Sequence, residues 1–259
     1  MTTTNITALT TQLEQFGYKL PKTIKPYLDS VEAINYAYDG LPVVPTEPVT
    51  EETAEAVLHA FAAETALALG TDGFTPLAVA KRRMVESYQA LALNELRADS
   101  TKIFETLSTV VDSAAEQLVA AVGNLPETLT PDALVEAGPV AVEALATATE
   151  AGQALGAIDL FVFQHGNALG FGVSPDKILR LFTPSGIGDY RKLEIAQNTS
   201  HNETETRIGY TFVVAAREGI PISLNDSKTS AVLADEIDAD RLRVASANPF
   251  NGRGWKING

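Results

Sequence analysis

From Leu77 to Val122 the chain runs for 46 residues without a single Gly or Pro. These are the two residues that most strongly disfavour a helix interior, so the whole stretch permits helix. A continuous helix of this length would span ~69 Å at ~1.5 Å per residue. The hexapeptide RADSTK in its middle is polar apart from one alanine, and Asp99 or Ser100 could cap a second helix. One long helix and a helix pair therefore both remain open.

The second half of this stretch carries an apolar stripe at steps of three and four residues. Its members are Ile103, Leu107, Val110, Ala114, Leu118 and Ala121. Such spacing places the side chains on one helix face, and a long apolar face needs a partner surface. Further on, small residues such as Ala148 and Gly152 share a face and predict close packing against another helix.

Several helix starts are marked by a polar residue followed by proline. Thr75-Pro76 and Thr130-Pro131 each place a capping side chain before a proline that suits the first helical turn. Ser174-Pro175-Asp176 is predicted to open a short helix that runs to about Phe182. Gly138-Pro139 predicts a kink or a restart. Thr50 could cap a helix whose first turn holds two glutamates, a favourable place for negative charge.

Residues 1–48 have a different character and predict an extended N-terminal arm. Their apolar residues come in short patches, and Pro42, Pro45 and Pro48 form a tether that is incompatible with helix. We expect this arm to bind neighbouring subunits, so that deleting residues 1–40 would leave the rest folded.

Beyond Ile158 the apolar pattern is closer to period two, which is typical of strands. Strands are predicted in IDLFVFQH, KLEIAQNTS, TRIGYTFVVAA, IPISL and RLRVASA. The run Leu160–Phe163 should be buried, with either Phe161 and Phe163 or Leu160 and Val162 facing the core. Helices followed by strands predict an α+β fold. Its parts are an arm and tether at 1–48, a long-helix body at 49–156 and a β-rich C-terminal part at 157–259.

Charge limits the classes of partner. The net charge is −14, and the 74 residues from Ile103 to Asp176 contain ten Asp and Glu but no Lys or Arg. Nucleic-acid binding requires Lys and Arg to neutralise phosphates, so no direct nucleic-acid binding is expected. The segment predicts either a solvated acidic face or an interface for a basic partner.

The absence of cysteine excludes disulfides, thiolate metal sites and cysteine nucleophiles. The first residues resemble neither a secretory signal nor a transit peptide. The longest uncharged run, Leu160–Pro175, is shorter than a membrane span and is interrupted by polar residues. We therefore expect a soluble protein made in the cytoplasm, with no membrane association.

The stretch LFVFQHGNALGFGVSPDKILRLF, residues 160–182, contains the best candidate for a small-molecule site. Its glycines fit neither the dinucleotide-binding nor the phosphate-binding loop, and no nucleophile elbow accompanies His165. A strand-end histidine with a structural hydrogen bond is the simpler interpretation. The alternative is an enzyme or small-ligand binder around His165, assembled with Asp159, Tyr190 and Arg191.

A second candidate is HNETE, where His201, Glu203 and Glu205 would share one face of an extended segment and could hold a divalent metal. Its polar surroundings favour a solvated hairpin tip instead. The sequence therefore predicts no catalytic residue, no cofactor and no metal.

An extended arm, a long helix and a β-rich part containing TRIGYTFVVAAREGIPISL together resemble the structural proteins of tailed-phage virions. The resemblance is in outline and implies a capsid, neck or tail component. It departs from the capsid pattern in lacking a two-stranded loop after the arm and in its large acidic segment 103–156. What it implies is a structural assembly protein that forms homo-oligomers or binds other subunits through the N-terminal arm, with a place in a virion.

Overall fold

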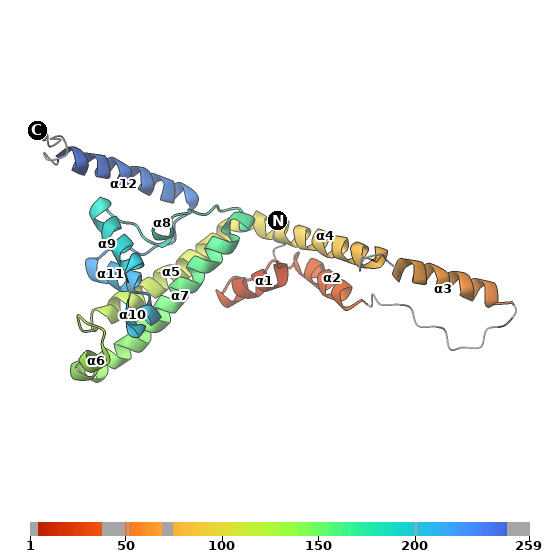
Figure 1. Ribbon diagram of the computed structural model, residues 1–259, viewed down its shortest axis with the longest axis horizontal. Helices are drawn as coiled ribbons and strands as arrows, with labels where there is room; N and C mark the ends of the chain where they lie inside the picture. Colours follow the sequence, from red (N-terminus) through yellow and green to blue (C-terminus); the bar gives the residue numbers. More distant parts are fainter. Residues whose placement is uncertain (1–4, 38–49, 51, 69–74, 200, 248–259) are drawn as a thin grey trace, which may run out of the picture. The chain divides into compact units, whose positions relative to one another are not determined.

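The computed structural model describes residues 5–37, 50, 52–68, 75–199 and 201–247. Within these ranges twelve helices account for 78% of the residues, and no sheet occurs. The expected α+β class is therefore wrong, because the described chain is all-α. The chain forms two compact units, Met1–Asp99 and Ser100–Gly259, whose helices are labelled in Figure 1.

The first unit is built around one long helix. It contains α1 (Ile6–Gln15), α2 (Lys25–Tyr36), α3 (Ala54–Ala68) and α4 (Pro76–Ala98). The hydroxyl of Thr75 accepts a hydrogen bond from the N–H of Ala78, so α4 begins at the predicted Thr-Pro signal. Contacts with α4 are made by α1, α2 and α3.

The described part of the predicted arm is helical rather than extended. Leu9 and Leu13 of α1 and Val31 of α2 are buried, as are Ala92 and Leu96 of α4. Polar contacts join the same elements: Tyr18 donates its hydroxyl to Asp99 at 2.6 Å. Residues 5–37 therefore belong to the fold of the first unit. The sequence interpretation failed because it extended the helix-incompatible character of GLPVVPTEP, residues 40–48, to the whole arm. That stretch lies outside the described residues.

The helix-permissive stretch 77–122 contains two helices, not one. The first, α4, ends at Ala98, and α5 (Ser100–Val122) begins two residues later. Asp99 between them has φ −103° and ψ 14°, outside the helical region. The polar hexapeptide RADSTK, which left both alternatives open, contains the break between α4 and α5.

The second unit is centred on α5 and α7 (Pro139–Leu169), joined through the short α6 (Pro131–Ala137). The rings of Phe104 and Phe171 meet edge to face, with centroids 5.6 Å apart, which pairs the start of α5 with the end of α7. The two helices therefore run antiparallel, as Figure 1 shows. The buried seam of α5 consists of Ile103, Leu107, Val111, Ala114, Leu118, Ala121 and Val122. It matches the predicted stripe except that Val111 is buried in place of Val110 and that Val122 is buried in addition.

Five further helices pack around this pair. They are α8 (Lys177–Leu181), α9 (Ile187–Asn198), α10 (Glu203–Ile208), α11 (Tyr210–Glu218) and α12 (Ser227–Ala247). Contacts join α10 to α7, α11 to α5 and α9, and α12 to α8 and α9. The predicted short helix after Ser174-Pro175-Asp176 is α8, and Asp176 caps it by accepting hydrogen bonds from Ile178 and Leu179.

The predicted strands are helices in four of five cases. IDLFVFQH continues α7, KLEIAQNTS lies mainly in α9, TRIGYTFVVAA spans α10 and α11, and RLRVASA ends α12. IPISL is extended, but it forms only an isolated bridge between Phe182 and Ile222. The period-two reading failed in α7 because its buried positions Leu155, Ile158 and Val162 still follow steps of three and four.

The run Leu160–Phe163 is half buried. Phe161 and Val162 are each 2% exposed, whereas Leu160 is 54% and Phe163 56% exposed. Both predicted alternating pairs are therefore wrong. In a helix, consecutive residues are 100° apart, so two neighbours can share the buried side, which a strand does not allow.

Candidate functional site

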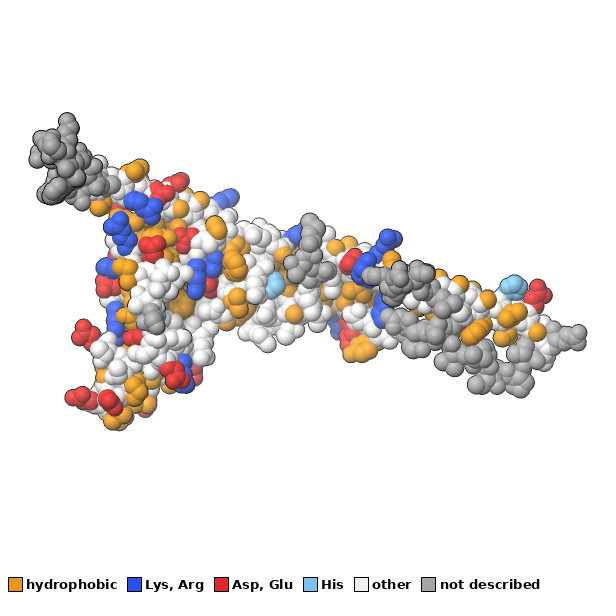
Figure 2. Space-filling model, in the orientation of Figure 1, with side chains coloured by type: hydrophobic (Ala, Val, Ile, Leu, Met, Phe, Trp, Pro, Cys, Tyr) orange, Lys and Arg blue, Asp and Glu red, His pale blue; other side chains and the backbone are white. Residues whose placement is uncertain are grey.

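The most unusual surface of the molecule is helix α3. Eleven of its fifteen residues are Ala, Val, Leu or Phe, yet Ala68 is the only one of the fifteen that is buried. Leu58 is 67% exposed and Leu67 51% exposed. Figure 2 shows hydrophobic side chains, in orange, at the surface of this helix. A helix that is apolar all round is normally buried, so α3 has less cover than its composition calls for.

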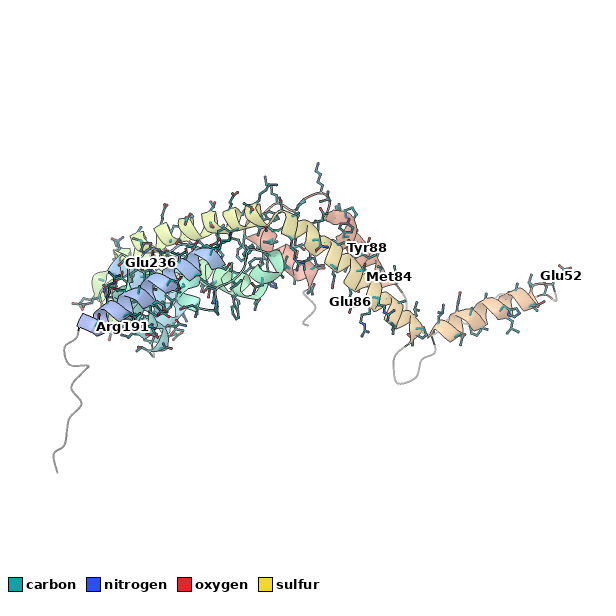
Figure 3. The ribbon with its side chains drawn as sticks, turned by 90° about the horizontal axis from the view of Figure 1, so that it is seen from above. Glu52, Met84, Glu86, Tyr88, Arg191 and Glu236 are labelled. Atoms are coloured by element: carbon teal, nitrogen blue, oxygen red, sulfur yellow. The ribbon has the colours of Figure 1, made fainter. Side chains whose placement is uncertain are left out.

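The exposed side chains of α3 do not form a single stripe. Leu58 and Leu67 are nine residues apart, or two and a half turns, so they lie on about opposite sides of the helix. The half-buried residues Val57, Phe61 and Thr65 form a separate line between them. Figure 3 draws the side chains of α3 as sticks around the helix. One neighbouring helix can cover one side only, and so the contact with α4 leaves apolar surface open.

The second feature is a buried ion pair in the other unit. Arg180 of α8 donates from Nε to Oδ1 of Asp159 at 2.8 Å and from Nη2 to Oδ2 at 3.3 Å. Its third nitrogen, Nη1, donates to the carbonyl of Ser174 at 3.1 Å, and the guanidinium lies 4.9 Å from the centre of the Phe163 ring. Both side chains are about nine-tenths buried or more. The bidentate geometry satisfies the charges that burial would otherwise penalise.

The same corner of the fold contains two further buried polar side chains. Asn225 donates to the carbonyls of Leu179 and Phe182, both at 3.1 Å. Ser230 of α12 donates to the carbonyl of Leu179 at 2.9 Å. These bonds join α12 and the segment before it to α8 and its C-cap Phe182. All of these partners are backbone groups, which indicates a structural role.

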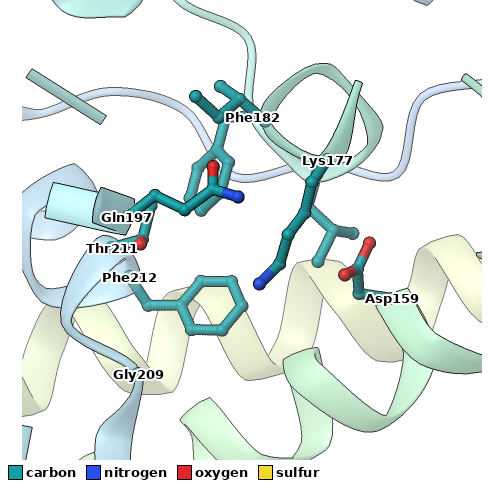
Figure 4. Close-up of a pocket in the computed structure, with 9 residues that line it drawn as sticks. Asp159, Lys177, Phe182, Gln197, Gly209, Thr211 and Phe212 are labelled. Atoms are coloured by element: carbon teal, nitrogen blue, oxygen red, sulfur yellow. The ribbon is translucent and has the colours of Figure 1, made fainter. Parts of the chain in front are cut away.

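A cavity of about 90 Å³ lies next to the ion pair. Its lining comes from α7, α8, α9 and α11, and in Figure 4 the side chain of Lys177 reaches into it between Asp159 and Phe212. Gln197 and Thr211 are at its other side. Ligand sites usually measure ~300–1,000 Å³, so this cavity has room for a few waters only. The carboxylate of Asp159 is already bound by Arg180.

The residues of the predicted small-molecule site are not brought together. His165 lies near the end of α7, with its ring 5.2 Å from that of Phe161, and burial lowers its pKa. Tyr190 donates its hydroxyl to Asp176 at 2.8 Å, and burial, followed by this bond, raises the pKa of Tyr190 to about 12. Arg191 is exposed on α9, and Asp159 is paired with Arg180. The glycines that follow His165 serve the turn: Gly170, at φ 92°, ends α7.

The segment HNETE is a helix start, not an extended metal site. Asn202 and Glu205 form a reciprocal capping box at the beginning of α10, and Glu203 pairs with Arg207. His201 packs on the Tyr210 ring at 4.1 Å, and its Nε2 is 2.6 Å from the carbonyl oxygen of Ala196. Across the described ranges, no group of three or more His, Asp or Glu side chains could hold a metal ion.

Sequence reasoning missed two of these features. Arg180 gave no signal, because its partner is 21 positions earlier in the chain. The composition of α3 did carry a signal: AEAVLHAFAAETALA has only four polar residues. A count of apolar residues per helix would have identified it.

Among the helices that the structure describes, none is long and apolar enough to cross a membrane. Neither protein-family models, nor curated protein sequences, nor solved structures give a match to this chain.

Proposed function

We propose that this protein is a structural assembly subunit that self-associates through α3, with no enzymatic activity. The observation that carries the proposal is the apolar helix α3, of which one residue in fifteen is buried. Because its exposed leucines lie on opposite sides, α3 calls for more than one additional neighbour. A bundle of α3 helices from several copies would provide them.

The charges on α3 favour a protein partner over a lipid surface. Its ionisable side chains are Glu55, His59 and Glu64, without Lys or Arg. Helices that lie on membranes usually carry Lys or Arg on their polar face to attract anionic lipids. Two glutamates on fifteen residues leave most of the helix surface free to enter an apolar interface.

The setting we propose is a symmetric particle such as a phage virion, in its shell, neck or tail. The support for this setting is the likeness in outline to virion proteins. The structure shares less of that outline than the sequence predicted. The likeness to the capsid fold included a β-rich C-terminal part, and the described residues of that part form helices and no sheet. The assembly role rests on α3 and does not need the sheet.

Size-exclusion chromatography with light scattering on the full chain tests the proposal. The test variant is Leu58→Gln with Leu67→Gln, which keeps good helix formers at exposed positions. Burying a leucine fully is worth ~1.5–3 kcal/mol, and roughly half or more of each side chain is exposed, so we expect a loss of about 2–3 kcal/mol per copy. Since ~1.4 kcal/mol is tenfold, association should weaken roughly 100-fold.

The matched control is Val135→Gln with Val142→Gln, which removes exposed apolar side chains from the second unit, where they are 77% and 52% exposed. We expect the control to assemble as the unmodified chain does. A monomeric unmodified chain at high concentration would refute the proposal. Equal effects of the two variants would show that α3 is not the contact.

A further inference from the structure

A second surface, independent of α3, lies on the outer face of α5. Five residues of α5 at steps of three and four line an open groove of about 600 Å³, together with the segment that precedes α12. The lining consists of Asp112, Ala115, Glu116, Val119, Ala120, Pro221 and Ile222. None of the five belongs to the buried seam of α5, and four of them are exposed, so α5 contributes surface and not core to this groove.

The groove has an apolar floor and an acidic rim. Val119 is 50% exposed, and it lies beside alanines and Pro221. Asp112 and Glu116 are both exposed, and no described residue forms an ion pair with either. The nearest stretch of chain offers no cation, since Ile103–Asp176 contains none. Arg217 of α11 is held elsewhere, by the carbonyls of Pro126 and Glu127 at 2.6 and 2.8 Å.

The chain contains a segment with the complementary chemistry. Residues 248–259, NPFNGRGWKING, carry Arg253 and Lys256 and no acidic residue. They also hold Phe250 and Trp255, the only tryptophan of the chain. Aromatic and Arg side chains are the most frequent anchors in protein interfaces, and opposite charges at the rim favour the correct encounter.

We propose that residues 248–259 of one copy bind the α5 groove of a second copy. Binding to the groove of the same copy is disfavoured by reach. The helix α12 begins five residues after Ile222, which forms one wall of the groove. The 21 residues of α12 then carry the chain ~30 Å away from that point. Phe250 is three residues beyond the end of α12, or ~10 Å of extended chain, and Trp255 is eight residues beyond it, or ~27 Å, so that even fully extended neither returns as far as the start of α12. A contact of this kind, tail to groove, joins different surfaces of two copies.

The tryptophan allows the contact to be measured directly by its fluorescence. The experiment uses the full chain with α3 silenced by Leu58→Gln and Leu67→Gln, so that failure of the proposed α3 contact cannot affect it. In this background we expect the Trp255 emission to shift to shorter wavelength as protein concentration rises. The shift should weaken in high salt, because salt screens exposed charges.

Two variants in this background separate tail from groove. The first reverses the groove by Asp112→Lys and Glu116→Lys and keeps Trp255. The second keeps the groove and disables its own tail by Arg253→Glu, Lys256→Glu and Trp255→Phe. The first alone should show no blue shift, and addition of the second should restore the shift. The matched control, Glu143→Lys with Glu150→Lys on exposed positions of α7, makes the same charge change and should behave as the parent does.

The proposal is overturned if the groove-reversed variant shows the parent's shift, or if the second variant fails to restore it. A blue shift that does not depend on concentration would place the tail in its own copy and also overturn it. A second measurement guards against misfolding of the groove-reversed variant. A synthetic peptide of residues 248–259, titrated into the full chain carrying Trp255→Phe, should show the blue shift. A peptide with Arg253→Glu and Lys256→Glu should not.

Discussion

Gly152 of α7 lies directly against the backbone of Ile208, the last residue of α10. A Cβ at position 152 would overlap the carbonyl oxygen of Ile208 and lie 2.8 Å from its carbonyl carbon. Gly156, one turn later on α7, has no atom within 4 Å of the same position. Gly152 therefore permits the close approach of α10 to α7, whereas Gly156 has no neighbouring segment that requires a glycine.

Gly152→Ala should destabilise the second unit, because the added methyl group meets backbone that cannot rotate away. We expect a loss of roughly 1–3 kcal/mol, the usual cost of overpacking. Gly156→Ala, the control, should raise stability by up to about 1 kcal/mol, because alanine is the better helix former. Urea unfolding followed by circular dichroism measures both. Equal changes in the two variants would mean that α10 does not pack on α7 in this way.

Arg180→Ala should be among the most damaging single substitutions in the chain. It leaves the carboxylate of Asp159 buried without its partner, which typically costs ~3–5 kcal/mol. Arg191→Ala, on an exposed position of α9, should change stability by no more than about 0.5 kcal/mol. Thermal unfolding of both variants tests this. A second measurement uses Asp159→Leu with Arg180→Met, where an apolar pair should recover much of the loss.

The stability of the second unit should depend on pH through His165. Burial lowers the pKa of this side chain below its ordinary value of 6.5, so the unfolded chain binds a proton more readily than the folded chain. The contribution is fully present above pH 6.5 and is lost as the pH falls from 6.5 through the lowered pKa. His165→Gln should reduce the fall in melting temperature between pH 7.5 and 5. A His165→Gln variant whose melting temperature falls as far as that of the unmodified chain would contradict this prediction.

Leu13→Ala tests whether the N-terminal helices belong to the first unit. Leu13 is fully buried, and removing a buried leucine side chain costs ~2–5 kcal/mol. Tyr36→Ala, at a position 82% exposed, should cost about 0.5 kcal/mol or less. Denaturant unfolding gives both values. A Leu13 variant as stable as the control would support the arm that the sequence predicted.

Local signals in the sequence located helix starts well. Thr75, Thr130 and Asp176 each cap the helix that was predicted to follow them. Such caps depend on one side chain and the next three residues, so a short stretch of sequence contains all the information. The seam of α5 was also largely predictable, because spacing along a single helix determines which side chains share a face.

The residues beyond Ile158 could not be assigned from spacing alone. Short apolar runs rich in aromatic and β-branched residues fit both strand and helix, and the choice depends on which neighbours are available to bury them. For the segment 158–165 that neighbour is α5, whose buried seam already packs against the earlier part of α7. The segment therefore continues α7 as a helix and does not start a strand. The grouping of His165, Tyr190 and Arg191 into a candidate small-molecule site could not be judged from spacing either, because it depends on how the helices pack.

What the sequence determined by itself is the starts of α4, α6 and α8, the acidic segment 103–176 and the absence of thiol chemistry. Only the tertiary structure decided that Asp159 pairs with Arg180, that Gly152 receives the end of α10, and that α3 keeps its leucines exposed. Helix starts and spacings are set by interactions between residues three or four positions apart. Burial, pairing and exposure are set by contacts between distant segments, which exist only after the chain has folded.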